Sequence, residues 1–158
     1  MAHILFICHL KILNMDNWIY YGVFFSESSQ KTLLNLAKEY TGIPDDWKIF
    51  CHHMTIIYND KSQEKQEMAE VLDNFLGNTQ SMRIDSIGVS DRAIALGVAD
   101  YTTQNEHSHI TVATAPDAKP VESNNITNWY KLPESFYISG KLDVFRNLSI
   151  KNKNNKYD

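Results

Sequence analysis

The sequence is poor in cysteine, in long apolar runs and in positive charge, and each shortage excludes a class of protein. Two cysteines, Cys8 and Cys51, occur in 158 residues, which is too few for a disulfide framework. No stretch reaches the length of about 18 apolar residues that a transmembrane helix needs, and the N-terminal run lacks the features of a cleaved signal peptide. The net charge of −4 argues against an extended basic track for duplex nucleic acid. We therefore expect a cytoplasmic protein without a membrane partner, and its oligomeric state stays open.

The order of the expected elements is mixed, without regular strand–helix alternation. Aromatic and branched residues predict strands at 17–25, 48–59, 81–90, 92–100, 107–114 and 136–146. Helical spacing predicts one helix from an N-cap at Ser26 to Tyr40 and another from a capping box at Asp60 and Gln63 to Gly77. Residues 115–125 are expected to form a loop, and 126–130 one helical turn. The pattern favours an α+β fold.

The chain is expected to be a single domain over residues 1–158, because this length can bury one substantial core. Within it, residues 1–14 are expected to be an extension outside the essential fold. Residues 147–158, rich in Asn and Lys, are expected to be a flexible tail.

Two segments place histidine and threonine two residues apart in apolar surroundings, "CHHMTIIYN" at 51–59 and "HSHITVAT" at 107–114. Side chains alternate between the faces of a strand, so His53 shares a face with Thr55 and His109 shares one with Thr111. By the same alternation His52 is expected to point the other way, as a packing or surface residue.

Two such pairs in one pocket would supply a complete set of groups for phosphodiester cleavage. An unperturbed imidazole titrates near pH 6.5, so one histidine can accept a proton while another donates one. Threonine hydroxyls donate hydrogen bonds to phosphoryl oxygens. Neither role requires a metal.

The segments "HHMTI" and "HSHITVA" resemble the paired His-x-Thr signatures of the 2H phosphoesterase superfamily. "HITVATAPDAKPVESN" is most similar to the cyclic-phosphodiesterase branch found in RNA ligases and in stand-alone viral and bacterial relatives. The resemblance implies a two-lobed fold, with antiparallel sheets around a central cleft and helices outside. It implies acid/base catalysis by His53 and His109, with Thr55 and Thr111 holding the phosphate, and neither metal nor other cofactor.

Two substrate classes fit that resemblance and stay open. One is an RNA-type phosphodiester such as a 2′,3′-cyclic phosphate, and the other is a cyclic oligonucleotide messenger that viral relatives degrade to blunt host defence. In both cases the ligand is a nucleotide or oligonucleotide. Further substrate contacts are predicted at Tyr21, Lys119, Ser123 and Asn124, and less strongly at Arg92.

Two rival interpretations also stay open. Cys51 and His53 on one strand, with His107 and His109 on another, have a spacing that suits a zinc site. That site would leave both threonines without a role. A nucleotide-binding module without catalytic activity is the second rival, although both His-Thr pairs are present.

Overall fold

One long strand, β7 (Trp129–Arg146), connects the two halves of the sheet in the computed structural model, which describes residues 17–147. Its C-terminal part pairs with β1 (Trp18–Phe24) and its N-terminal part with β4 (Thr79–Val89), both antiparallel. The predicted extension at 1–14 and residues 148–158 of the predicted tail lie outside the described residues.

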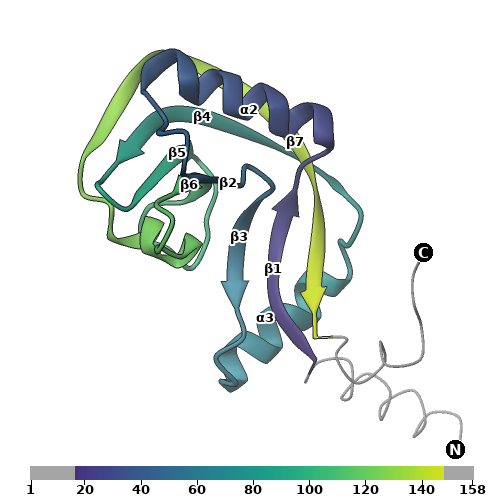
Figure 1. The fold of residues 1–158 in the computed structure, drawn as a ribbon. Coiled ribbons are helices and arrows are strands. Elements are labelled where there is room, and N and C mark those ends of the chain that lie inside the picture. Colours follow the sequence, from purple (N-terminus) through teal and green to yellow (C-terminus); the bar gives the residue numbers. More distant parts are fainter. Residues whose placement is uncertain (1–16, 148–158) are drawn as a thin grey trace, which may run out of the picture.

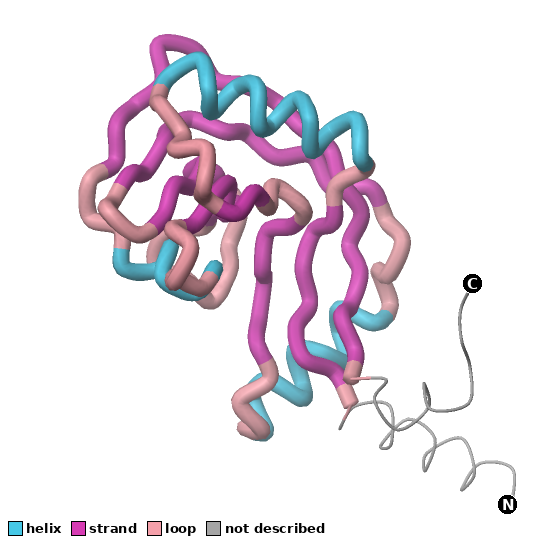
Figure 2. The backbone as a smooth tube through the Cα atoms, viewed as in Figure 1, coloured by secondary structure: helices cyan, strands magenta, loops and turns pink. Residues whose placement is uncertain are grey.

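The sheet closes on itself through the two strands that carry the His-Thr motifs (Figures 1 and 2). β1 pairs with β3 (His53–Tyr58), and β4 pairs with β5 (Ala93–Ala99). β6 (His109–Thr114) then pairs with both β5 and β3, and the short β2 (Lys48–Ile49) adds to it. The result is a closed antiparallel sheet, and the predicted α+β class is confirmed.

Few helices accompany the sheet, and two of them cover its outer side. α2 (Glu27–Tyr40) has the predicted N-cap at Ser26, buries Leu33 and Ala37, and lies against β6 and β7. α3 (Gln63–Asp73) packs behind β1, where Trp18 Nε1 donates to Gln66 and the Tyr21 hydroxyl donates to Asp73. The third, η1 (Pro120–Asn125), is a 3₁₀ helix in the segment predicted as a loop. No helix of residues 17–147 is long and apolar enough to cross a bilayer.

The strand predicted over 48–59 is instead two strands. Cys51 adopts a left-handed conformation, with φ of 64°, which interrupts the extended backbone between β2 and β3. The amide groups of Phe50 and Cys51 donate to the carbonyl groups of Val112 and Thr111 on β6. The interruption therefore changes which side chains of this segment share a face.

Two local predictions are also wrong. The N-cap of α3 is Ser62, whose hydroxyl accepts from the Lys65 amide group, while Asp60 accepts from the Ser62 amide group outside the helix. Residues 126–130 are not a helical turn, because Asn128 accepts from the Val89 amide group and β7 begins at the next residue. In both cases hydrogen bonds to neighbouring segments decide the local conformation.

Candidate active site

The two motif strands meet where Met54 of β3 pairs with Ile110 of β6. Both side chains are completely buried. In an antiparallel ladder, residues on either side of a pair are matched in opposite order. The Met54–Ile110 register therefore places His53 opposite Thr111 and Thr55 opposite His109, so that each histidine faces the other motif's threonine.

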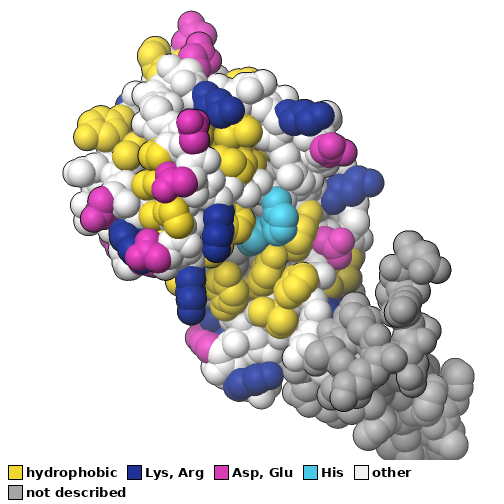
Figure 3. Space-filling view, viewed as in Figure 1, with side chains coloured by type: hydrophobic (Ala, Val, Ile, Leu, Met, Phe, Trp, Pro, Cys, Tyr) yellow, Lys and Arg dark blue, Asp and Glu magenta, His cyan; other side chains and the backbone are white. Residues whose placement is uncertain are grey.

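All four side chains line one cleft of about 280 Å³. In the space-filling view, histidine side chains lie beside a band of hydrophobic side chains (Figure 3). The lining is mainly aromatic and imidazole on the β1 and β3 side, and it includes the loop before β6 and the start of η1. The lining residues are Tyr20, Phe50, His52, His53, Thr55, Tyr58, Asn105, His109, Thr111, Pro120, Val121 and Asn124.

His53 lies in a stack of rings that partly buries it. Its ring centroid is 4.6 Å from that of Tyr20 and 5.5 Å from that of Phe24. Its Nδ1 lies 2.5 Å from Nδ1 of His52, so one of these two nitrogens carries a hydrogen and the other accepts it. Burial, followed by the nearby His52 and His109, lowers the pKa of His53 to about 4. His53 is therefore neutral near pH 7 in the unliganded protein.

His109 is held in one tautomer by the backbone. Its Nδ1 lies 2.7 Å from the carbonyl oxygen of His107, an atom that can only accept, so the hydrogen is on Nδ1. Nε2 of the neutral ring is then free to accept a proton. Burial lowers the pKa of His109, although the hydrogen bond to His107 opposes this effect.

Small residues on β4 and β5 leave room for an indole ring beneath this second motif. A Cβ atom at Gly88 would lie 2.8 Å from the Trp129 ring, and one at Gly97 would lie 3.2 Å from it. Trp129 stacks on His107 with a centroid distance of 4.0 Å and lies 6.3 Å from His109. The indole thus supports the segment whose carbonyl group orients His109.

The Thr111 hydroxyl is hydrogen-bonded to Ser123. The two hydroxyl oxygens are 2.9 Å apart, and Ser123 is 1% exposed. Asn124, the next residue of η1, lines the cleft itself. Of the four predicted substrate contacts, Asn124 therefore lies in the cleft, and Ser123 lies directly behind it.

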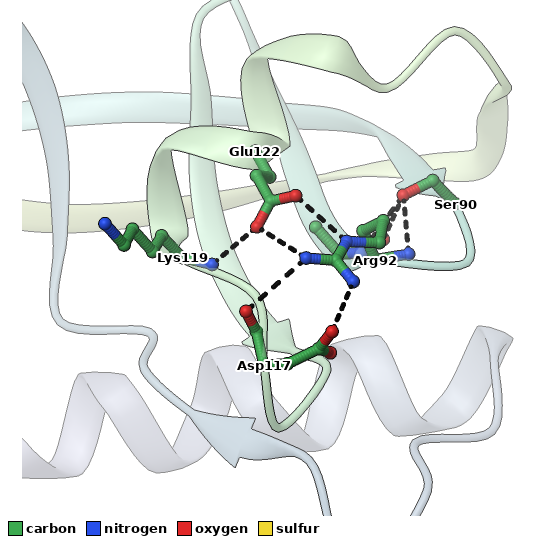
Figure 4. Close-up of polar contacts among 6 residues, drawn as sticks. Ser90, Arg92, Asp117, Lys119 and Glu122 are labelled. Atoms are coloured by element: carbon green, nitrogen blue, oxygen red, sulfur yellow. Dashed lines mark hydrogen bonds and ion pairs between the residues drawn. The ribbon is translucent and has the colours of Figure 1, made fainter.

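Arg92 anchors the segment that carries these two residues (Figure 4). Its guanidinium group donates to Glu122 at 2.9 Å through Nε and to Asp117 at 2.9 Å through Nη1. Glu122 also accepts from the amide group of Lys119. Arg92 is thus a positioning residue in this structure, and the exposed side chain of Lys119 lies outside the cleft lining.

The prediction for Tyr21 needs correction. Tyr21 is 1% exposed, donates to Asp73 of α3 and packs edge-to-face on Trp18. It therefore belongs to the face of β1 that α3 covers, whereas its neighbour Tyr20 lines the cleft. His52 is exposed, as expected of a surface residue, but the expectation that it points away from His53 is wrong, since the turn at Cys51 brings its side chain to the cleft beside His53.

The geometry does not assemble the zinc site. Cys51 is buried, its thiol donates to the Val112 carbonyl group at 3.9 Å, and burial raises its pKa to about 12. The thiol thus points into the core, away from His53 and His109. Within residues 17–147, no group of three or more His, Cys, Asp or Glu side chains is arranged to hold a metal ion.

Comparison with known proteins shows the family of the chain. Residues 32–144 match the family described as the fungal tRNA ligase phosphodiesterase domain. The chain belongs to this family. That confirms the resemblance drawn from the two motifs, and the matched segment includes both of them. Membership places the chain among phosphodiesterase domains of RNA processing, without specifying the bond that is cleaved.

A solved structure, titled as a crystal structure of a fungal RNA kinase, has the same fold. It is 14% identical, with a TM-score of 0.59, and the match covers 83% of this chain and 46% of that one. This chain therefore corresponds to less than half of that protein. No curated protein sequence matches the chain.

Several cleft residues were missed by sequence reasoning, among them Tyr20, Phe50, Tyr58 and Asn105. Their aromatic or polar character is ordinary in a strand or loop, and their position depends on strand register. The sequence around Tyr20 carries no signal that would have placed it in the cleft, because the choice between Tyr20 and Tyr21 depends on which face of β1 is covered by α3.

Proposed function

We propose that this chain hydrolyses RNA-type phosphodiesters, 2′,3′-cyclic phosphates in particular, by metal-independent acid/base catalysis with His53 and His109. The observation that carries the proposal is the Met54–Ile110 register, because it faces each histidine with the other motif's threonine in one cleft. In this proposal the β1–β3 half and the β4–β5–β6 half of the sheet are the two lobes, and the phosphate binds between them.

The proposed reaction transfers one proton at each histidine. His109 Nε2 takes a proton from water, whose oxygen attacks phosphorus, because its Nδ1 is already committed to the His107 carbonyl group. The bond from phosphorus to one ribose oxygen breaks, and His53 gives that oxygen a proton. The product is a phosphomonoester with a free ribose hydroxyl group. The two imidazoles exchange protonation states in one turnover and return through solvent.

His53 must be protonated when the substrate is bound. In the free protein its pKa is lowered to about 4 by burial and neighbouring imidazoles. An anionic phosphate within hydrogen-bond distance favours the imidazolium form, so substrate binding raises this pKa. The proton then sits where charge develops on the leaving oxygen.

Threonine hydroxyl groups hold the phosphoryl oxygens in this scheme. If Ser123 donates to Thr111, the Thr111 hydrogen is free to point toward the cleft. Thr55 offers the equivalent donor opposite His109. Asn124 adds an amide group at the η1 side of the cleft, suited to a ribose or base.

The RNA substrate is favoured over a cyclic oligonucleotide messenger by the RNA-processing family to which the chain belongs. A non-catalytic binding module would not need two matched His-Thr pairs, of which one has a fixed tautomer. For these reasons the hydrolase is the function that we propose.

A product assay tests this function. The full chain would be incubated with nucleoside 2′,3′-cyclic phosphates, with RNA ending in a 2′,3′-cyclic phosphate, and with cyclic di- and trinucleotides, each with and without EDTA. We expect the first two to yield phosphomonoesters at unchanged rates in EDTA. Turnover confined to cyclic oligonucleotides, abolition by EDTA, or binding of all substrates without turnover would each contradict the proposal.

A further inference from the structure

Three rings form a ladder across the sheet beside the cleft. Tyr20 of β1 is paired with Tyr58 of β3 on one side and with Phe145 of β7 on the other. The Tyr20 ring is stacked with that of Phe145 at 5.3 Å, and it lies 5.5 Å from that of Tyr58. The three side chains share the face that carries His53 and Thr55, opposite the face covered by α3.

The two outer rings of this ladder are open to ligands, whereas Tyr20 between them is 9% exposed. Phe145 is 49% exposed and Tyr58 is 37% exposed. Large exposed aromatic groups that adjoin a polar cleft commonly mark a binding surface. The band of hydrophobic side chains beside the histidines includes this region of the sheet (Figure 3).

The ladder is continuous with the catalytic cleft. Tyr20 and Tyr58 line that cleft, and the Tyr20 ring is stacked on His53 at 4.6 Å. Two ring-to-ring steps, of 4.6 Å and 5.3 Å, thus lead from His53 over Tyr20 to Phe145. Because these neighbours cover the Tyr20 ring, a base that follows the reacting nucleotide can stack on the exposed Phe145 ring but not on Tyr20.

Charge on the same face favours bases over phosphates as the groups that contact the sheet. The register places Asp143 opposite Gly22, between the Tyr20 rung and the Phe24 rung, and places Lys141 opposite Phe24. A carboxylate group there repels phosphates but not neutral bases. Lys65, which donates to Gln104 beside Tyr58, and Lys141 lie at the margins, where a backbone could pass.

We propose that the Tyr58–Tyr20–Phe145 ladder binds the bases of single-stranded RNA next to the reacting phosphate, with Phe145 stacking on the penultimate base. The inference rests on the proposed function, since it assumes that the phosphate lies at His53. Stacking on aromatic side chains accepts any base and contributes about 1–3 kcal/mol per base. The ladder therefore selects an oligonucleotide end over a mononucleotide, without selecting its sequence.

Phe145→Ala tests the inference, with Tyr137→Ala as the matched control. Tyr137 is an exposed aromatic residue of the same strand that is paired with Arg83 of β4, outside the cleft lining. We expect Phe145→Ala to lower the ratio of kcat/KM for RNA ending in a cyclic phosphate to kcat/KM for a nucleoside cyclic phosphate, by about five-fold or more. Phe145→Tyr and Tyr137→Ala should keep the wild-type ratio.

A modified substrate gives the sharper comparison. In the wild type, removal of the penultimate base from the RNA should lower kcat/KM by the same factor as Phe145→Ala does. In Phe145→Ala, removal of that base should not lower kcat/KM further, because the ring and the base interact as one pair. An unchanged ratio in Phe145→Ala, or equal further loss with the abasic RNA, would overturn the proposal. So would a wild-type dimer that Phe145→Ala dissociates in sedimentation, since a second copy would then cover this face.

Failure of the proposed function can be distinguished from failure of the ladder. If the wild type cleaves neither substrate, the reaction is wrong. Fluorescence anisotropy with labelled single-stranded RNA then tests the ladder alone. Weaker RNA binding by Phe145→Ala than by Tyr137→Ala supports the ladder, and equal binding contradicts it.

Discussion

Met54 and Ile110 form the cross-strand pair around which the two His-Thr motifs are arranged, and neither side chain is exposed. The pair holds the two motif strands together, and the catalytic groups occupy the adjacent positions on the opposite face. Its packing thus determines how far apart His53 and His109 lie. This relationship yields the first prediction.

Met54→Ala should reduce both stability and activity. Removal of a fully buried Met side chain costs about 2–5 kcal/mol in the free energy of unfolding. The weaker packing between β3 and β6 should also lower kcat. Met68→Ala is the control, since Met68 is 38% exposed on α3. Urea unfolding and steady-state kinetics measure the two effects. Equal stability of the two variants would show that the Met54–Ile110 pair is not tightly packed.

Ser123→Ala should lower activity indirectly, because it leaves Thr111 in place but removes the hydrogen bond that orients it. The hydrogen bond between the two hydroxyl groups orients Thr111 toward the phosphate, and one such bond is worth about 1 kcal/mol. We expect kcat/KM to fall about five-fold while the fold is kept. Ser28→Ala, at an exposed position of α2, serves as the control. The assay should be repeated with Ser123→Ala in a Thr111→Val background, where the further loss should vanish. If Ser123→Ala lowers kcat/KM five-fold in that background too, Ser123 does not act through Thr111.

Acid should destabilise the protein through His53. The pKa of His53 is about 4 in the folded protein, whereas an unfolded histidine titrates near 6.5. Between these values the unfolded state binds more protons, so the free energy of unfolding falls as the pH drops from about 6.5 to about 4. His109, whose pKa is also lowered, adds to the fall.

Urea unfolding at pH 7 and pH 4.5 checks this dependence. His53→Asn should show a smaller loss of stability between the two pH values than the wild type. An NMR titration of the imidazole resonances gives the pKa directly, and inorganic phosphate should raise the value for His53. A His53 pKa near 6.5 in the free protein would contradict the account.

Arg92→Gln should loosen the η1 segment without unfolding the sheet. Arg92 ties Asp117 and Glu122 to the turn between β4 and β5. Without it, residues 115–125 should be cut faster in limited proteolysis, and KM should rise more than kcat falls. Arg83→Gln is the matched control, because Arg83 is paired with Asp100 elsewhere on the sheet. Equal rates of proteolysis of this segment in both variants would contradict a positioning role for Arg92.

The motif strands show what local pattern can and cannot predict. Strand alternation correctly pairs His53 with Thr55 and His109 with Thr111, because the register shifts of β3 and β6 lie beyond these threonines, after Thr55 and after Thr111. It fails one residue earlier, where the left-handed Cys51 breaks the alternation and redirects both Cys51 and His52. The left-handed backbone at Cys51 is therefore the reason that Cys51 does not join His53 in a zinc site and that His52 lines the cleft instead.

The remaining errors depend on long-range pairing. Nothing within "WIYYGVF" distinguishes Tyr20 from Tyr21 as a cleft residue, since the choice follows from where α3 packs on β1. Likewise β7 begins at Trp129 because β4 pairs with it there. The α+β class and the helix capped by Ser26 were predictable, because they follow from composition and local periodicity.

The most direct test compares His53→Ala, His109→Ala and the double variant on RNA ending in a 2′,3′-cyclic phosphate. A positioned acid or base contributes about 10²–10⁴ in rate, so each single variant should lose at least about a hundred-fold in kcat with an unchanged circular dichroism spectrum. Since the two histidines serve one reaction, the double variant should be little worse than the poorer single variant. Full activity in either single variant, or losses that multiply in the double variant, would contradict two histidines acting together on one phosphate.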